Sequence, residues 1–434
     1  MVVAQIIIIV ALILMITGKV PLYLTAFVGA TVAALAGGWS FFGSGPGTVM
    51  GLVVANGLHP VILDMLGILL FIGIMEKVGF LNSIILKIIE VGHKLGGGPG
   101  VATAGGIGAG IIGGMTGFTQ PAITGVVTGP PAVEMGVDKN RVAGILAHAG
   151  HLGNLGGFTH PTIVAVVAMT GIAWGPTNIV GIIVALSIFA ASYIRVNRMM
   201  KKEGTQAKEV DIKLEAAEVP FVKAIIPFCV LIVAFVFGVP VVMAGIGSAF
   251  VVVLMSIRNF VQGEKDMMQG LLRITVPLFA TVAFLFMAGV VREIGLIDLL
   301  IRSEGGVVVG GLLYGAMRAS PLVLILIMFL VGSVAGLVTQ SNGASIPFIL
   351  PVLLALLEAG VNPVAAAVAA AGGPAIMQYY LTGGPVAALS TVIPIIPGSD
   401  LKLANRFQRP SILWGMLVLL IICIFLGIVM PHGF

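Results

Sequence analysis

Hydrophobic residues form long runs along this chain. Ten of the runs are candidates for helices that cross a membrane. They are residues 3–17, 20–38, 58–79, 139–172, 175–197, 222–238, 240–257, 270–292, 361–396 and 410–430. The runs predict an all-α polytopic membrane protein.

Two pairs of shorter apolar segments lie between the third and fourth run of each half. The pairs are 98–117 with 121–136 and 321–338 with 345–358, and each pair meets at a polar tip. A segment that turns inside a membrane must bury its open backbone groups in protein or line a cavity. We therefore predict one re-entrant hairpin in each half.

The two halves share three motifs, which occur in the same order and at a nearly constant offset. The motif pairs are Gly73–Asn82 with Gly289–Asp298, Gly117–Pro121 with Gly336–Asn342, and Glu134–Asp138 with Glu358–Asn362. Duplication with interrupted hydrophobic segments is typical of secondary transporters. An odd number of five spans per half inverts the second half relative to the first. We predict a first inverted repeat over 1–198, a cytoplasmic linker over 199–219 and a second inverted repeat over 220–434.

Composition and charge support a membrane location. Charged residues make up 9% of the chain, whereas soluble domains contain about a quarter, and mean hydropathy is +1.16. With the central loop inside, all but three of the 22 Lys and Arg residues are cytoplasmic, as the positive-inside rule requires. This predicts a multi-pass protein of the cell membrane with both termini external, and the net charge of +5 needs no nucleic-acid partner. Segments 80–95 and 296–305 mix charged and apolar residues, so we predict short interfacial helices there, with plain connecting loops as the alternative.

Four interruptions of the hydrophobic pattern are predicted to meet near the middle of the membrane. They are the hairpin tips at 116–121 and 339–343 and the broken spans at 150–161 and 372–385. Pro cannot continue a helical hydrogen-bond ladder, and Gly allows the chain to leave it. The exposed N-terminal ends of the half-helices suit an anion, and the carbonyl ends suit Na⁺.

The candidate site residues carry hydroxyl, amide or imidazole groups, or lie in the turns of these interruptions. We predict substrate binding by Thr119, Gln120, Asn154, Thr159, Thr339, Gln340, Ser341, Asn342, Gln378 and Thr382. We predict ion coupling by Thr116, His151, His160 and Gly343. Small polar residues in membrane helices commonly serve only helix packing, but the Thr-Gln pair recurs at both tips, which favours a transport site.

Three histidines on one broken span leave several interpretations open. His148, His151 and His160 could relay protons, ligate a metal, or remain neutral hydrogen-bonding groups. A metal site would need a further Cys or carboxylate ligand nearby, and none is evident, so no metal or other cofactor is predicted. Asp64, in the third run, is a further intramembrane acid or a residue of the outer interface.

The chain resembles the ion-transporter superfamily of secondary carriers over essentially its full length. Residues 92–97, 113–117 and 136–139 look like the large membrane subunit of TRAP-type dicarboxylate transporters, although the Pro-Pro-Ser run typical of that subunit is replaced by Phe158–Pro161. The second half, with the motif at 339–343, looks like anaerobic C4-dicarboxylate carriers and lactate permeases. The resemblance implies that hairpin tips and broken spans form substrate and cation sites and that one domain moves as an elevator.

These observations predict a secondary active transporter, not an enzyme, that moves a small organic anion with Na⁺ or H⁺. The expected substrates are C4-dicarboxylates or related carboxylates, and the expected environment is membrane lipid. The alternatives are a cation/proton antiporter and the membrane subunit of a tripartite (TRAP-type) uptake system, which would need a small membrane subunit as partner. We also expect a homodimer, because scaffold domains of such carriers often pair.

Overall fold

The structure is a computed structural model of the 434-residue chain. It describes residues 1–16, 20–117, 119, 121–205, 217–256, 259–272, 275–299, 302–304, 307–311, 320–381 and 383–430. Most of the described chain is helical, in agreement with the predicted fold class.

The first half contains helices at every predicted run. They are α1 (Val2–Ile16), α2 (Leu22–Ala36), α3 (Val49–Leu52), the π-helix η1 (Val53–Gly57), α4 (Val61–Lys77), α5 (Phe80–Thr116), α6 (Ala122–Glu134), α7 (Lys139–Ala147), α8 (Ala149–Gly156), α9 (Pro161–Thr170) and α10 (Pro176–Glu203). The predicted interruption of the fourth run is confirmed, because α8 ends at Gly156 and α9 begins at Pro161.

The second half is also a series of elements, most of them helices. They are α11 (Phe221–Val236), α12 (Val241–Ser256), α13 (Phe260–Leu272), α14 (Thr275–Glu293), the 3-10 turn η2 (Ile297–Leu299), strands β1 (Arg302–Glu304) and β2 (Val307–Gly310), α16 (Pro321–Thr339), α17 (Asn342–Glu358), α18 (Pro363–Met377), α19 (Gly383–Val392), the 3-10 turn η3 (Ile393–Ile395) and α20 (Leu401–Val429). The helix pair α16–α17 corresponds in order to α5–α6, and α18–α19 to the broken span α7–α9.

Among the described residues, fewer helices are long enough to cross a membrane than the ten spans that the sequence predicts. Four helical stretches of the described chain are long and apolar enough to cross a membrane, namely Lys139–Thr170, Pro176–Glu203, Pro321–Thr339 and Leu401–Val429. The bent pair Val49–Gly57 and Val61–Lys77 provides a fifth. Most of the other runs form helices of 10–17 residues, which at about 1.5 Å per residue are shorter than the hydrocarbon core. The prediction of five full spans in each half therefore exceeds what the helix lengths show.

Two segments depart from the predicted local structure. The described residues of the predicted interfacial segment 296–305 form the 3-10 turn η2 and the strand β1, which pairs antiparallel with β2. The β-branched run Val307–Val309 favours a strand over a helix. Helix α13 was not predicted, because its charged positions resemble a loop when only hydrophobic runs are counted.

The predicted interfacial helix at 80–95 is helical, and it continues directly into the first hairpin arm. The two parts join at Gly96 and Gly97, whose backbone angles are not helical. Gly97 has a φ of 53°, in the left-handed region that favours glycine. The kink thus separates a charged segment from the apolar arm within one element.

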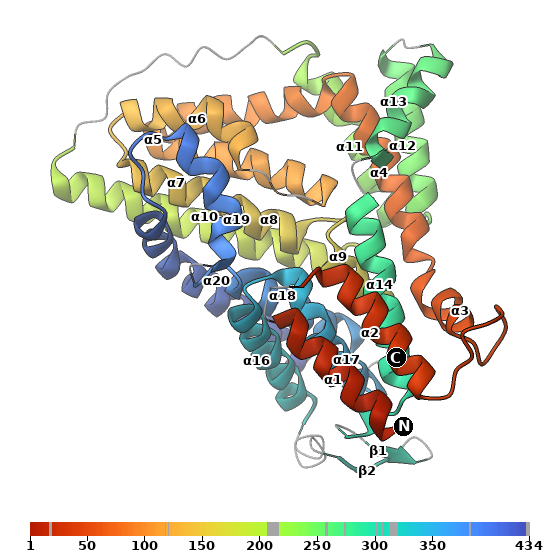
Figure 1. The fold of residues 1–434 in the computed structure, drawn as a ribbon. Coiled ribbons are helices and arrows are strands. Elements are labelled where there is room, and N and C mark those ends of the chain that lie inside the picture. Colours follow the sequence, from red (N-terminus) through yellow and green to blue (C-terminus); the bar gives the residue numbers. More distant parts are fainter. Residues whose placement is uncertain are drawn as a thin grey trace.

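The helices form three groups, and some helices of each half pack on helices of the other half (Figure 1). One group contains α5, α6, α7, α8 and α10, a second contains α4 with α11, α12 and α13, and a third contains α16, α17, α18 and α20. Helix α4 of the first half packs on α12 and α13 of the second, and α14 of the second half packs on α2 and η1 of the first. The packing between the halves is therefore reciprocal.

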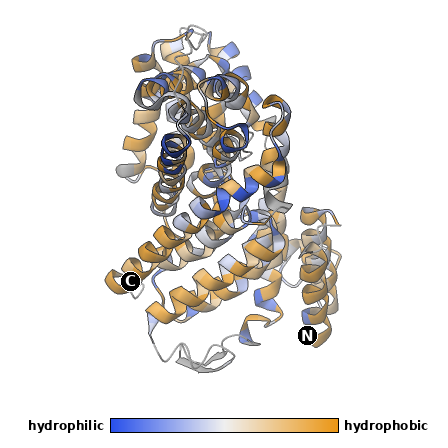
Figure 2. Ribbon diagram, turned by 90° about the vertical axis from the view of Figure 1, so that its left-hand side faces the viewer, coloured by the Kyte–Doolittle hydropathy of each residue, from blue (hydrophilic) through white to orange (hydrophobic). Residues whose placement is uncertain are grey.

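Many helices are hydrophobic along most of their length (Figure 2), and large apolar side chains on them are exposed. Examples are Ile6 on α1, Val222 on α11 and Ile428 on α20, which are 54%, 70% and 65% exposed. Exposed apolar surface on this scale is not stable in water and indicates contact with lipid. The structure therefore agrees with a membrane protein.

Candidate functional site

The first hairpin and the first broken span are joined at the end of α5. Helix α5 ends immediately before Gly117, which has a φ of 74°. The backbone N–H of Phe158 donates to the carbonyl of Gly114 over 2.8 Å, and the hydroxyl of Thr159 donates to the carbonyl of Met115 over 2.9 Å. The last carbonyls of a helix have no partner within it. The segment between α8 and α9 therefore supplies the hydrogen bonds that complete the end of the hairpin arm.

Thr119 lies in a gap that two glycines provide. A Cβ on Gly113 would come within 2.2 Å of the Thr119 Oγ1, and a Cβ on Gly153 within 2.0 Å. The Thr119 hydroxyl is buried and has no hydrogen-bond partner within the described residues. Thr116, by contrast, donates to the Ile112 carbonyl of its own helix over 2.9 Å. Thr119 is therefore a hydroxyl at this tip whose hydrogen-bonding capacity the described residues leave unused.

The second tip is a tight turn that uses its own polar side chains. Gln340 has a φ of 50°, the one positive φ of a non-glycine residue within the described chain. The Thr339 hydroxyl donates to the Ala335 carbonyl over 2.7 Å and lies 2.9 Å from the Ser345 hydroxyl. The Ser341 hydroxyl accepts a backbone N–H in the first turn of α17. Thr339 and Ser341 thus stabilise the turn itself.

Asn342 connects this tip to both broken spans. Its backbone N–H donates to the Gln378 Oε1 over 2.9 Å, and its Nδ2 lies 3.5 Å from the Asn154 carbonyl. The same Nδ2 lies 3.3 Å from the His160 Nδ1, which also accepts the backbone N–H of Thr162. Because an amide nitrogen can only donate, the His160 Nδ1 is an acceptor, and a neutral His160 carries its proton on Nε2.

Tyr379 connects the two broken spans to each other. Its hydroxyl accepts from the Asn154 Nδ2 over 3.0 Å, and its carbonyl accepts from the Asn405 Nδ2 of α20 over 3.1 Å. The ring packs edge-on against His151, with centroids 4.7 Å apart. A Cβ on Gly150 would lie 2.1 Å from the Tyr379 hydroxyl oxygen, so a glycine at position 150 makes room for this contact.

We call Asn154, His160, Asn342, Gln378 and Tyr379 the polar junction. They come from α8, the start of α9, the start of α17 and the end of α18. Through them the second hairpin tip and both broken spans are hydrogen-bonded together, and the first tip joins through the segment at 157–160. The predicted meeting of the four interruptions is therefore visible in the hydrogen bonds.

The remaining predicted residues lie around the junction or outside the described chain. Thr159 and Thr119 lie at the first tip, and His151 lies against Tyr379. Gly343 faces Leu22 of α2, since a Cβ there would lie 3.5 Å from the leucine side chain. Gln120 and Thr382 lie outside the described residues.

Sequence reasoning did not select Tyr379 as a site residue, although it noted the interruption that contains it. A tyrosine beside apolar residues is commonly a packing residue, and its role here depends on Asn154, which lies 225 positions away in the chain. The available signal was the position of Tyr379 directly after a helix end within a Gly/Pro-rich interruption.

Helix ends of both polarities meet at the junction, because α9 and α17 begin there and α18 ends there. None of its five side chains is a Lys, Arg, Asp or Glu. Helix α17 begins at Asn342 and α9 begins directly after His160, and the N-terminal end of a helix carries partial positive charge. Two such ends meet at the junction. No three His, Cys, Asp or Glu side chains of the described residues lie close enough to hold a metal ion.

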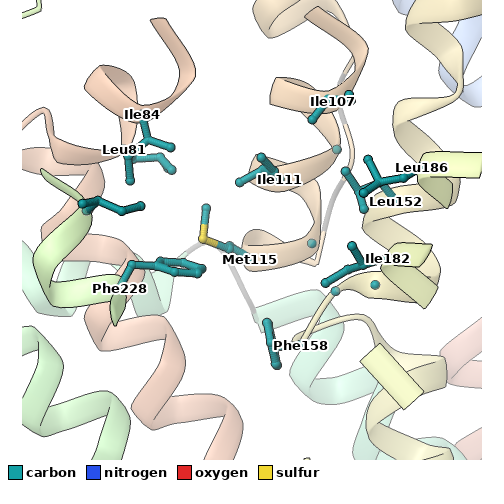
Figure 3. Close-up of a pocket in the computed structure, with 15 residues that line it drawn as sticks. Leu81, Ile84, Ile107, Ile111, Met115, Leu152, Phe158, Ile182, Leu186 and Phe228 are labelled. Carbon is teal, nitrogen blue, oxygen red and sulfur yellow. The ribbon is translucent and has the colours of Figure 1, made fainter. Parts of the chain in front are cut away.

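An apolar cavity of about 340 Å³ lies on the other side of the segment at 157–160 (Figure 3). Side chains of α5, α8, α10 and α11 line it, and Met115, Phe158 and Phe228 border its centre. Phe158 faces this cavity, whereas His160, two residues later, contacts the junction. The cavity lies between α11 and the first hairpin arm.

Asp64 lies away from the junction, at the start of α4. Its Oδ1 accepts the backbone N–H of Val242 over 3.1 Å, and its Oδ2 accepts from the Trp174 Nε1 over 3.3 Å. The carboxylate thereby ties α4 to the start of α12 and to the loop before α10. With His59 it borders a second cavity of about 330 Å³.

The fold is that of known membrane transporters. The chain is similar to the YdaH transporter of Alcanivorax borkumensis, with a TM-score of 0.58, 16% sequence identity and 88% of each chain covered. It is also similar to MtrF of Neisseria gonorrhoeae, described as one of a class of antimetabolite efflux pumps, with a TM-score of 0.57, 12% identity, and 94% of this chain and 95% of MtrF covered. No protein-family model matches the chain, and no curated protein matches it by sequence. The class is thus a polytopic membrane protein with a transporter fold, and the resemblance to TRAP-type and C4-dicarboxylate carriers stays a prediction.

Proposed function

We propose that this protein is a secondary active transporter of a small organic anion, coupled to Na⁺ or H⁺. The observation that carries the proposal is the polar junction, where two helix N-termini and uncharged amide and hydroxyl groups meet without Lys or Arg. Such donors can hold a carboxylate without a fixed positive charge that would impede its release. C4-dicarboxylates and related carboxylates are the proposed substrates.

We propose that transport uses alternating access in an inverted repeat. The repeated sequence motifs and the reciprocal packing of α4 and α14 support this arrangement. The two hairpins and two broken spans would form the moving elevator domain, and α1, α2, α10, α11, α12 and α20 the scaffold. The scaffold helices would also form the homodimer contact.

Flux in proteoliposomes tests the proposed function. The purified chain is reconstituted, and labelled succinate, fumarate, malate, citrate and lactate are measured for uptake and for efflux, each with and without a Na⁺ or pH gradient. Gradient-dependent movement of at least one anion supports the proposal. If every organic anion fails to move and to bind, while an imposed Na⁺ gradient moves protons, the protein is a cation/proton antiporter.

Two further outcomes concern partners and direction. Activity that appears only when a small helical membrane subunit co-purifies would favour a tripartite uptake system. The similarity to MtrF favours export as a second candidate, because MtrF is described as an efflux pump. Export is distinguished by flux from loaded vesicles that exceeds uptake under the same gradient.

A further inference from the structure

A row of buried polar side chains follows one face of α20 toward its start. Asn405, Gln408 and Ser411 are spaced three residues apart, so they lie on one side of the helix. They are 0%, 0% and 2% exposed. Buried polar groups in a membrane protein are costly and commonly mark a path for water, ions or substrate.

The row continues through hydrogen bonds into α10 and the first broken span. The Ser192 hydroxyl donates to the Ser411 Oγ over 2.7 Å, and the His148 Nε2 lies 2.7 Å from the Ser192 Oγ. Because the Ser192 proton is directed to Ser411, its oxygen accepts from His148. His148 therefore carries a proton on Nε2, and its Nδ1 is an acceptor.

The row reaches the polar junction through a second histidine. The rings of His148 and His151 have centroids 5.4 Å apart, and His151 contacts the Tyr379 ring. Asn405, at the other end of the row, donates to the carbonyl of the same tyrosine. We call Asn405, Gln408, Ser411, Ser192, His148 and His151 the polar track.

Several polar atoms of the track lack a partner in the described protein. They are the His148 Nδ1, both ring nitrogens of His151 and both amide atoms of Gln408. A buried polar group without a partner is destabilising, and ordered water is the usual partner of such groups. The Gln408 side chain lies beside Gly144 of α7, one helical turn before His148. A water molecule between the Gln408 and His148 side chains would connect these two members of the track by hydrogen bonds.

Few charged groups lie near the two histidines. The hairpin arm from Gly98 to Thr116 and helices α18 and α19 contain no titratable residue, and α6 contains Glu134 alone, which is exposed. On α10, Arg195 donates to the Phe407 carbonyl, and on α20, Arg409 donates to the Tyr380 carbonyl. On α7 itself, Arg141 pairs with Glu203. Tyr379 and the histidines themselves are the titratable groups that face the track from within.

We propose that the polar track is a hydrated proton path between the polar junction and the Leu401 end of α20. This inference rests on the proposed function and makes H⁺ the coupling ion. Water carries a proton from the junction past His151 to the His148 Nδ1, because no hydrogen bond joins the two histidines directly. The Nε2 proton then passes to Ser192, the Ser192 hydroxyl proton passes to Ser411, and the Ser411 proton passes to water beside Gln408. The reverse order returns a proton, so no bond other than O–H and N–H bonds changes.

Hydrogen–deuterium exchange at the histidine C2 position tests the path without any substrate. The full chain in phospholipid nanodiscs is incubated in D₂O at values from about pH 5 to about pH 8, and each histidine is followed by mass spectrometry. We expect His148 to exchange and its rate to change with pH, because the path delivers both water and protons. No measurable exchange at His148 over this range would overturn the proposal.

Two variants locate the path. Gln408→Leu keeps the size of the side chain and removes its amide, and Ser192→Ala removes the hydroxyl next to His148, so both should slow His148 exchange at least fivefold. Ser187→Ala is the matched control on α10, because Ser187 bonds only to the Val184 carbonyl of its own helix. His93, outside the track, should exchange alike in all variants. Equal His148 exchange in wild type and both variants would overturn the path.

Failure of the path and failure of the proposed function give different results. His148 exchange that depends on Gln408, in a protein that moves no anion, would keep the path and remove the anion transporter. Anion transport in a protein whose His148 is inert would remove the path and keep the transporter.

Discussion

At the residue scale, the two hairpin threonines have different environments despite their matching positions in the repeat. Sequence comparison predicts equal roles for Thr119 and Thr339. In the structure the Thr339 hydroxyl is bonded within its own turn, whereas the Thr119 hydroxyl has no partner within the described residues. Hydrogen bonding within a tight turn depends on backbone geometry that repeat matching does not contain.

This difference predicts opposite effects of the same substitution. Thr119→Val should raise the KM for the transported anion about tenfold, or about 1.4 kcal/mol, with little change in stability. Thr339→Val should lower the unfolding free energy by about 1 kcal/mol and change KM less. Uptake kinetics and thermal melts of both purified variants measure this. Equal KM values in Thr119→Val and wild type would mean that the first tip does not contact substrate.

Asn342 offers the second residue-scale prediction, because its side chain bonds to the first broken span. Asn342→Leu keeps the backbone bond to Gln378 but removes the amide near His160 and Asn154. We expect transport to fall at least tenfold while the protein still folds. Asn197→Leu is the control, since Asn197 bonds only to the Tyr193 carbonyl on α10. Similar losses in both variants would argue against a special role of the junction.

At the scale of elements, hydrophobic runs and Gly/Pro interruptions were sufficient to predict most helices and the broken span after Gly156. They did not predict α13, because an amphipathic helix needs periodicity rather than a run. The strands after η2 were also missed. Every residue of the polar junction except Tyr379 was among the predicted candidates, but the pairings join side chains far apart in sequence, which no local pattern specifies.

Close packing between the hairpin tip and α8 gives a prediction about a glycine. Gly153→Ala would place a methyl group 2.0 Å from the Thr119 oxygen, so the tip must move away from α8. We expect a destabilisation of about 1–3 kcal/mol and loss of most transport. Gly247→Ala on α12, where a Cβ would meet nothing within 4 Å, should be neutral or slightly stabilising. Thermal melts and uptake compare the two.

The charged part of α5 gives a pH prediction. Glu90 accepts from Lys87 over 2.8 Å and pairs with Lys94, and these hydrogen bonds lower the pKa of Glu90 to about 2. Because the folded pKa lies below the usual value of 4.5, this contribution to stability is present above pH 4.5 and disappears as pH falls toward about 2. Glu90→Gln should therefore melt slightly below wild type at neutral pH and together with it in strong acid. High salt should shrink the difference.

At the scale of the whole molecule, the apolar cavity lies where the proposed scaffold helix α11 faces the proposed moving hairpin. In a variant lacking Cys229 and Cys423, a cysteine pair at Met115 and Phe228 would report on this boundary. We expect its crosslinking to change when the transported anion and ion gradient are added, and the crosslink to block flux. A pair at Gly105 and Thr128, which touch within one hairpin, should crosslink equally in all conditions. Constant crosslinking of both pairs would argue against an elevator.

The reciprocal packing of α4 and α14 has a consequence for how the chain is made. When only the first half has been synthesised, α12 and α13, on which α4 packs, do not yet exist. The same is true of α14, on which α2 packs. At Gly67 and Gly73 of α4, the atoms nearest to an added Cβ are backbone atoms of the second half. In the newly inserted first half, the faces of α4 and α2 that will pack on the second half are therefore still uncovered. A membrane chaperone or the insertion machinery itself would have to shield these faces until the second half arrives.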